Sequence, residues 1–216
     1  MKYTEKEKIW SLQYPEDDAA ANDIIQKMSD DMKISLICAK VIYNRGYKSV
    51  ADARKFIGAD INALEDPFLM RDMDVAVSRI LEAVQNRQKI TVYGDYDVDG
   101  VTSVTLIYLY LKDMGADVDY YIPSRSGEGY GLSVTAIDKL KESGTELIVT
   151  VDTGITAVYE SEYAKAEGID MVITDHHECH QNIPEACAVV NPHRPDCKYP
   201  FAELAGDGVV FKLICA

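Results

Sequence analysis

The sequence predicts an α/β fold: a doubly wound, mainly parallel sheet preceded by an all-helical N-terminal region. Residues 1–88 contain only apolar patterns of helical spacing, whereas from residue 89 short β-type apolar runs alternate with helix-length segments. In that second part, polar residues suited to chemistry directly follow the β-type runs. Alternation of this kind indicates βαβ units and a parallel sheet.

The N-terminal region has helical spacing of apolar residues at 18–28, 34–44, 50–56 and 73–85. Asp72 is a candidate N-cap for the last of these helices. We place the boundary near residues 87–89, which divides the chain into a helical region, 1–88, and an α/β domain, 89–216. For the helical region we expect a packing role.

The α/β domain opens with the apolar run 90–93. Further β-type runs follow at 118–122, 146–151 and 171–174, with a candidate fifth strand at 188–190. The helix-length segments between them are 102–114, 134–142 and 155–167, and the last ends at Gly168. This order predicts strands that are joined by crossover helices.

Carboxylates, an arginine and paired histidines follow four of the predicted strands. These residues are Asp95, Asp97, Asp99, Arg125, Asp152, Asp175, His176 and His177. Because the carboxyl ends of parallel strands meet at one edge of the sheet, we expect these side chains to converge. Crowded carboxylates are stabilised by a cation, and carboxylates with imidazoles fit Mn²⁺, Mg²⁺ or Zn²⁺, with two metals sharing ligands.

Other interpretations of these residues exist. Asp95–Gly100 matches the first six positions of an EF-hand loop, but the twelfth position, which must be acidic, is Leu106, and the preceding segment is β-like. Asp152 alone would be read as an N-cap of the following helix. Arg125 is equally consistent with a phosphate clamp and with a surface ion pair.

The two adjacent histidines allow a division of roles. In an extended chain, His176 and His177 would point to opposite sides. One ring would then bind a metal while the other faces a substrate.

Composition narrows the classes of protein. The 216 residues are 47% hydrophobic, which is typical of a globular protein, and no apolar run approaches the roughly 20 residues of a membrane helix. The first residues lack a signal-peptide core, so we expect a cytoplasmic protein without membrane contact. The net charge of −14 counts against nucleic-acid binding, although bound metals would neutralise part of it.

The five cysteines form no Cys-x-x-Cys pair. Zinc at Cys179, Cys187 and Cys197 with the nearby His180 and His193 is disfavoured, because the spacings are irregular for a zinc module. Reduced thiols are the preferred interpretation.

Taken in order, these motifs resemble those of the DHH phosphoesterase superfamily. Gly94–Gly100, residues 151–154 and Asp175-His176-His177 look like its first three motifs. Within the superfamily the chain resembles the RecJ single-stranded-DNA exonucleases, whose further segments are similar to Arg45-Gly46, 66–68, 72–73, Glu128–Gly131 and 204–206. The chain departs from that family at Asp207, where a small or apolar residue is usual.

The resemblance implies a two-metal site with Mn²⁺ or Mg²⁺, held by Asp95, Asp97, Asp99, Asp152 and His176. Asp152 would bridge the metals. It further implies catalytic roles for Asp175, which would orient an imidazole, and for His177, which would contact the scissile phosphate. Arg125, His177 and Tyr130 are the expected substrate-binding residues, and Tyr130 is equally consistent with stacking on a base and with a packing role.

The implied reaction is metal-dependent hydrolysis of single-stranded DNA from its 5′ end, in DNA repair and recombination. Other repair proteins are expected partners, and the full-length form is expected to be monomeric. The family's fourth motif, another aspartate, is expected after Ala216, so the chain resembles an N-terminal fragment with weak activity. The apolar end 209–216 is then expected to pack poorly.

Two alternatives differ in the substrate or in the class of protein. A nanoRNase, a cyclic-dinucleotide phosphodiesterase or a manganese pyrophosphatase would act on small substrates, but such enzymes have a histidine at the position of Tyr93. A non-catalytic binding protein would not need the intact set of acids and histidines.

Overall fold

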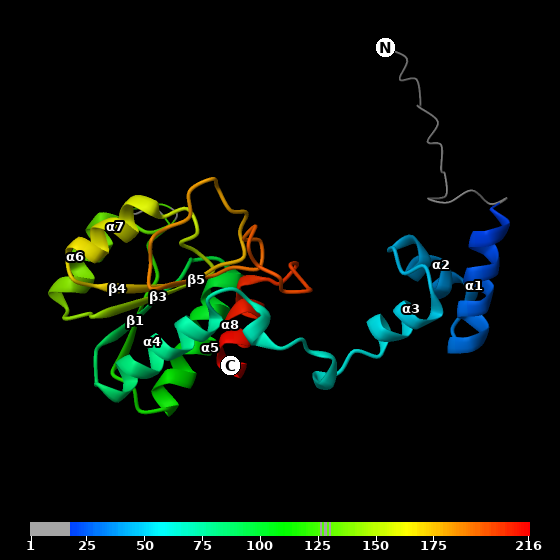
Figure 1. The fold of residues 1–216 in the computed structure, drawn as a ribbon, viewed down its shortest axis with the longest axis horizontal. Helices are drawn as coiled ribbons and strands as arrows, with labels where there is room; N and C mark the ends of the chain where they lie inside the picture. The colour runs from blue at the N-terminus through cyan, green and yellow to red at the C-terminus, as the bar shows by residue number, and fades with distance from the viewer. Residues whose placement is uncertain (1–17, 126, 128, 130) are drawn as a thin grey trace, which may run out of the picture. The chain divides into compact units, whose positions relative to one another are not determined.

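The computed structural model describes residues 18–125, 127, 129 and 131–216. Tyr130, the predicted base-stacking residue, lies outside the described residues. The chain forms two compact units, Met1–Leu64 and Glu65–Ala216 (Figure 1). None of the described helices has the length and apolar character that a membrane crossing requires.

The first unit is helical, as predicted. It contains α1 (Ala19–Met32), α2 (Leu36–Asn44), α3 (Val50–Ile57) and the short helix η1 (Ile61–Ala63). Asp18, Ser35 and Ser49 cap the three α-helices through side-chain oxygens that accept backbone N–H groups. Buried Ile25, Met28 and Ala39 lie in the core that the α-helices share.

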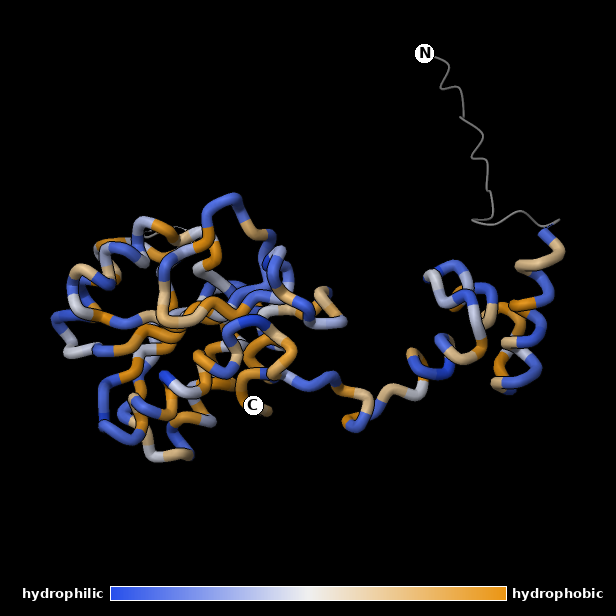
Figure 2. The backbone as a smooth tube through the Cα atoms, viewed as in Figure 1, coloured by the Kyte–Doolittle hydropathy of each residue, from blue (hydrophilic) through white to orange (hydrophobic). Residues whose placement is uncertain are grey.

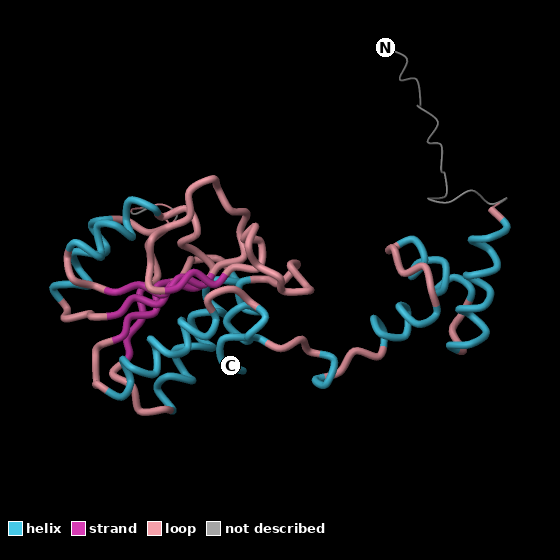
Figure 3. The backbone as a smooth tube through the Cα atoms, in the orientation of Figure 1, coloured by secondary structure: helices cyan, strands magenta, loops and turns pink. Residues whose placement is uncertain are grey.

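The second unit contains one sheet of five parallel strands, which lie side by side in Figure 3. They are β1 (Ile90–Tyr93), β2 (Val118–Tyr121), β3 (Leu147–Val151), β4 (Asp170–Thr174) and β5 (Ala188–Val190). Their order is β2-β1-β3-β4-β5. The chain runs one way from β1 to β2 and the other way from β3 onward, so the switch point lies between β1 and β3.

Helices cover both faces of the sheet, which confirms the predicted doubly wound architecture. The helices are η2 (Pro67–Leu69), α4 (Met73–Gln85), α5 (Val98–Asp113), α6 (Val134–Glu142), α7 (Val158–Ala166) and α8 (Gly206–Cys215). In Figure 1, α6 and α7 lie on one face, and α4, α5 and α8 on the other.

The two faces carry separate hydrophobic cores. Val149 and Val151 of β3 belong to the core under α4, α5 and α8, whereas Ile148 belongs to the core under α6 and α7. This alternation follows from the period of two in a strand. Figure 2 shows the hydrophobic residues gathered along the strands. Strands that are buried on both faces read as continuous apolar runs, which is why they were recognisable in the sequence.

The structure divides the chain after Leu64, not near residues 87–89. The reason is α4: its buried Met73, Ala76 and Ile80 join the core beneath the sheet. Periodicity alone identified this helix but did not indicate which unit it packs on.

Asp72 stands at the N-cap position of α4 but makes no capping hydrogen bond. Its carboxylate is bound instead by Arg194 and by the backbone N–H of Val189. The predicted position is therefore confirmed, whereas the predicted capping contact is wrong.

Two further expectations differ from the structure. The end of the chain does not pack poorly, because it forms α8, whose Val209, Val210 and Leu213 are buried where this helix packs on α5. In addition, α5 begins at Val98, four residues earlier than predicted. The polar Asp-Val-Asp-Gly segment concealed this start, although Asp97 is its N-cap.

Candidate metal centre

Asp95 and Asp152 lie at the switch point of the sheet, just past the ends of β1 and β3. Both are almost fully buried, with 3% and 1% of their surface exposed. Burial raises the pKa of the Asp95 carboxyl, and the hydrogen bond from the Tyr96 N–H partly opposes this. Two buried acids at the place where doubly wound folds bind ligands define the centre of the site.

Asp97 and Asp99 lie at the start of α5. Asp97 caps the helix, since its Oδ1 accepts the Gly100 N–H at 2.9 Å. The Asp99 carboxylate accepts the backbone N–H groups of Gly206 and Asp207, each at 2.7 Å. Asp99 therefore binds the N-terminus of α8 and draws that helix to the site. The unusual Asp207 takes part in this contact through its backbone.

The buried Oδ1 of Asp152 accepts no hydrogen bond of ordinary geometry among the described residues, and His176 Nε2 lies 3.1 Å from it. Its backbone is left-handed, with a φ of 58°. Burial, and then the charges of Asp99 and Asp97, raise the pKa of its carboxyl to about 8. A buried carboxylate that lies among other acids and beside an imidazole nitrogen is stabilised by a cation that both can bind.

Gly206, at the start of α8, approaches the Asp152 side chain closely. A Cβ atom on Gly206 would lie 2.5 Å from Asp152 Oδ1. Only a glycine can therefore stand where α8 begins, against this carboxylate.

Asp152 belongs to two separate groups of possible metal ligands among the described residues. One group is Asp95, Asp97 and Asp152, and the other is Asp152, His176 and His177, each with ligand atoms within 4.8 Å of one another. The Asp99 carboxylate adjoins the second group, with Oδ2 3.5 Å from His176 Nε2. Oxygen and imidazole donors around a shared carboxylate fit two divalent cations.

The buried Asp175 carboxylate organises the turn that carries the histidines. Asp175 Oδ1 accepts the backbone N–H groups of His176 and His177, and its Oδ2 accepts that of Ile155. Although burial raises the pKa of Asp175, the hydrogen bonds from His177 and Ile155 outweigh it and hold this pKa below its ordinary value. An ionised Asp175 thus joins the end of β4 to the turn before α7.

His177 is oriented by Asp175. Its Nδ1 lies 2.7 Å from Asp175 Oδ1, and this hydrogen bond raises the pKa of the imidazole to about 9, although burial opposes the shift. His177 is also a member of the possible ligand group that contains Asp152 and His176. The sequence predicted this orienting contact between an aspartate and an imidazole.

The two histidine rings do not point to opposite sides. Their centroids are 4.6 Å apart, and both residues belong to the ligand group of Asp152. The expectation assumed an extended chain, but the backbone turns after Thr174, where β4 ends and Asp175 binds the next two N–H groups.

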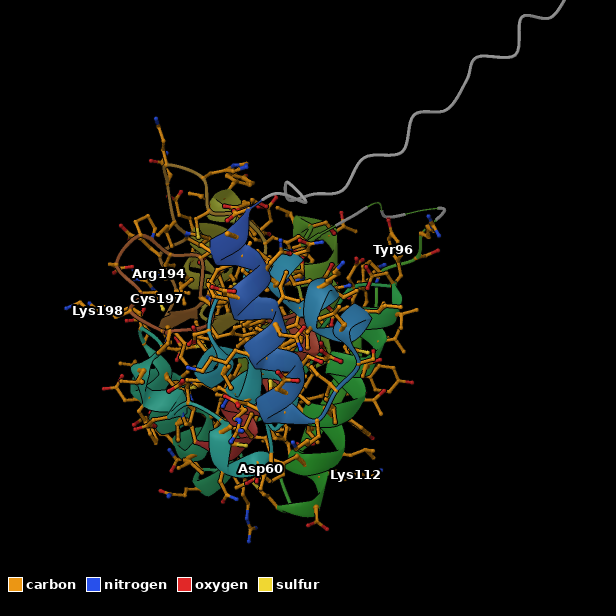
Figure 4. All side chains as sticks on the ribbon, turned by 90° about the vertical axis from the view of Figure 1, so that its right-hand side faces the viewer. Asp60, Tyr96, Lys112, Arg194, Cys197 and Lys198 are labelled. Atoms are coloured by element: carbon orange, nitrogen blue, oxygen red, sulfur yellow. The ribbon has the colours of Figure 1, made fainter. Side chains whose placement is uncertain are left out.

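Arg125 lies after β2 with an exposed side chain, and its guanidinium carbon is 5.3 Å from the ring centroid of Tyr96, which is labelled in Figure 4. This distance is in the range of a cation–π contact. The Tyr96 ring therefore supports the Arg125 guanidinium near Asp95, the residue that precedes Tyr96.

Sequence reasoning missed two parts of the site. Asn191 directly follows β5 and donates a hydrogen bond to the His177 carbonyl, so the rule applied to the other strand ends would have found it. The backbone N–H groups of Gly206 and Asp207 had no comparable signal, because they reach Asp99 only through the packing of α8.

The cysteines lie outside the candidate site. All five are free, and no possible metal-ligand group of the described residues contains one. The interpretation as reduced thiols is consistent with both observations.

Comparison with known proteins defines the class to which this fold and site correspond. Residues 89–216 match the model of the DHH family, N-terminal domain, and the chain belongs to this family. The predicted membership is thereby confirmed.

The matching curated proteins define a narrower group than the family model does. The chain is 43% identical over 204 residues to the single-stranded-DNA-specific exonuclease RecJ of Bacillus subtilis (strain 168), covering 94% of this chain and 25% of that protein. It is 38% identical over 163 residues to the RecJ of Haemophilus influenzae, covering 75% and 28%. The chain thus spans about a quarter of the length of the curated relatives it matches.

Solved structures show the same similarity. A crystal structure of exonuclease RecJ bound to manganese matches with a TM-score of 0.61 and 33% identity, over 67% of this chain and 37% of that one. RecJ from Thermus thermophilus in complex with Mn²⁺ matches with a TM-score of 0.69 and 25% identity, over 89% and 26%. The resemblance to RecJ proteins is confirmed by both comparisons.

Proposed function

We propose that this chain carries the metal-binding part of a single-stranded-DNA-specific exonuclease, which hydrolyses phosphodiester bonds from the 5′ end in DNA repair and recombination. The observation that carries the proposal is the pair of ligand groups that share the buried Asp152. The curated relatives are named for this activity, and two of the similar structures are of RecJ proteins with manganese.

The residues suit two Mn²⁺ or Mg²⁺ ions. We assign Asp95 and Asp97 to one ion, His176 and Asp99 to the other, and Asp152 to both. When bound, such ions lower the pKa of a coordinated water and stabilise charge on phosphoryl oxygens. The bridging role of Asp152 is supported by its membership of both ligand groups and by the 3.1 Å distance from its Oδ1 to His176 Nε2.

Two cationic side chains are assigned to the DNA backbone. His177, whose pKa of about 9 keeps it charged at neutral pH, is assigned to the scissile phosphate through Nε2. Arg125, whose guanidinium contacts the Tyr96 ring, is assigned to a neighbouring phosphate. A guanidinium binds a phosphate with two hydrogen bonds. Asp175 has an indirect catalytic role, since it fixes the orientation and charge of His177.

The alternative substrates, small nucleotides or pyrophosphate, have less support. They depend on a histidine at the position of Tyr93, whereas the Tyr93 hydroxyl donates to the Gly131 carbonyl and its ring stacks on Tyr121. Tyr93 therefore has a packing role. The base-stacking role of Tyr130, the interaction with other repair proteins, the monomeric state and the cytoplasmic location stay predictions.

The test uses single-stranded oligonucleotides labelled at the 5′ or the 3′ end, blunt duplex, a dinucleotide and pyrophosphate, each with Mn²⁺ present. We expect cleavage of single strands starting at the 5′ end and no cleavage of blunt duplex. Asp152→Asn is the inactive control, because asparagine tolerates the left-handed backbone at this position. Preferential cleavage of the dinucleotide or pyrophosphate would favour the alternative.

A further inference from the structure

The side chain of Asn191 lies at the carboxyl edge of the sheet but belongs to none of the ligand groups described above. It directly follows β5 and is fully buried, with 0% of its surface exposed. We propose that Asn191 is a positioning residue that holds the His176–His177 turn in the geometry required for metal binding. This inference rests on the proposed function, since it concerns the same metal centre.

The Asn191 amide makes two hydrogen bonds of opposite kind. Its Nδ2 donates to the His177 carbonyl at 2.9 Å, and its Oδ1 accepts the His193 N–H at 2.7 Å. One partner is only an acceptor and the other only a donor, so the orientation of the amide is determined. A carboxylate could replace the acceptance from His193 but not the donation to His177.

Asn191 completes a set of contacts that hold the turn from two sides. The Asp175 carboxylate binds the backbone N–H groups of His176 and His177, and the Asp175 N–H donates to the Val190 carbonyl of β5. The next residue after Val190 is Asn191, which binds the carbonyl at the far end of the turn. Backbone contacts matter here because the His177 side chain is 44% exposed, so the backbone hydrogen bonds and the contact of its ring with Asp175 together set its position.

The position of Asn191 is itself fixed by Arg194, whose side chain is only 9% exposed. Arg194 Nη1 donates to Asp72 Oδ2 and to the Val189 carbonyl, each at 2.6 Å, so the segment after β5 is bound to the start of α4. Figure 4 labels Arg194 beside Cys197 and Lys198. Because Arg194 holds the segment after β5 in place, the hydrogen bond from Asn191 can fix the position of the His176–His177 turn. A mobile segment could not do so.

A matched contact exists at the opposite edge of the sheet. Buried Ser161 donates from Oγ to the Glu185 carbonyl at 2.9 Å, and this contact binds α7 to the segment before β5. It resembles the Asn191 contact in length, burial and type. It lies at the amino ends of the strands, away from the metal centre, so Ser161→Ala measures the stability effect alone.

The experiment compares Asn191→Asp, Asn191→Ala and Ser161→Ala in the full chain, by Mn²⁺ calorimetry and by thermal unfolding without metal. We expect Mn²⁺ affinity to fall about 10- to 100-fold in both Asn191 variants and to change less than about 2-fold in Ser161→Ala. Asn191→Asp is the stricter case, because its added negative charge by itself would favour a cation. We expect all three variants to unfold at lower temperature than the wild type.

Two results would overturn the proposal. Either Mn²⁺ affinity in the folded Asn191 variants equals that of Ser161→Ala, or both Asn191 variants fail to fold, in which case the residue supports the whole unit and not the turn. Failure of the proposed function is distinguishable. A wild-type chain that binds Mn²⁺ but belongs to a protein without activity on single-stranded DNA would refute the function and leave the effect of Asn191 on Mn²⁺ affinity measurable.

Discussion

The amino and carboxyl edges of the sheet differ in whether their charged side chains have partners of opposite charge. At the amino edge, charged groups meet partners of opposite charge or polarity: Arg79 binds Asp170 at 2.8 Å and Gln88 at 2.9 Å, and Lys89 Nζ donates to the Ser143 carbonyl at 2.8 Å. At the carboxyl edge, Asp95, Asp152 and their acidic neighbours crowd together, and the described residues place no lysine or arginine in an ion pair with Asp152.

The difference separates a structural edge from a functional one. Exposed ion pairs at the amino edge hold strand ends and helix ends in place and contribute little free energy individually. Crowded acids at the carboxyl edge destabilise the metal-free fold, and such a cost is typical of sites that bind a cation. Substitutions or pH changes that act on one edge, followed by Mn²⁺ affinity and stability, test this separation.

The largest effect is expected for Asp152→Asn. The substitution keeps the shape of the side chain but removes the shared negative charge, so both ligand groups lose their common member. Mn²⁺ affinity should fall by at least about 100-fold, measured by calorimetry. The amino-edge variant Arg79→Met is the control and should bind Mn²⁺ as the wild type does. Unchanged affinity in Asp152→Asn would remove Asp152 from the site.

Gly206→Ala should have the next largest effect. The new Cβ would lie 2.5 Å from Asp152 Oδ1, so the carboxylate or the start of α8 must move. Mn²⁺ affinity should fall about 10- to 100-fold, because the bridging carboxylate is displaced. Gly208→Ala is the matched control, since its Cβ would meet only the Leu204 side chain, whose flexible Cδ2 is the nearest atom at 3.3 Å. Equal affinities in the two variants would contradict the tight approach of α8.

The pH dependence of Mn²⁺ binding should follow Asp152. Its pKa of about 8 lies above the ordinary 3.8, so below pH 8 a metal must displace a proton. Affinity should therefore rise as pH increases, by up to about tenfold per pH unit, and level off above about pH 8. Calorimetry between pH 6 and 9 measures this, and a flat profile below pH 8 would show that the carboxyl is already ionised.

The same shift predicts the opposite trend for stability. The folded state holds a proton on Asp152 that the unfolded state releases above its ordinary pKa, so the metal-free chain should lose stability as pH rises from about 4 to 8. Thermal unfolding across this range measures the loss. Saturating Mn²⁺ should reverse much of it, because the ion binds only the folded site.

The smallest effect is expected at the amino edge. Arg79→Met removes the contact with Asp170, which is half exposed, so the free energy of unfolding should fall by no more than about 1 kcal/mol. Chemical denaturation measures this change. A large loss of Mn²⁺ affinity in this variant would show that the two edges are coupled and that the comparison is too simple.

Most strands and helices were predictable because their causes are local. Strands buried on both faces are largely apolar, and helices such as Val134–Glu142 carry their own caps and periodicity. Boundaries failed where a polar site residue opened an element, as at Val98, because chemistry replaced the usual apolar signal there.

Local sequence by itself determined that acids and histidines follow parallel strands, and hence that they would meet at one edge. Tertiary structure alone decided how they meet. The left-handed backbone of Asp152 is one such feature, and the contacts of Asp99 with α8 and of Asn191 with His177 join residues 14 to 108 positions apart. Such contacts leave no periodic trace, because they depend on where whole helices and strands pack and not on the residues beside them.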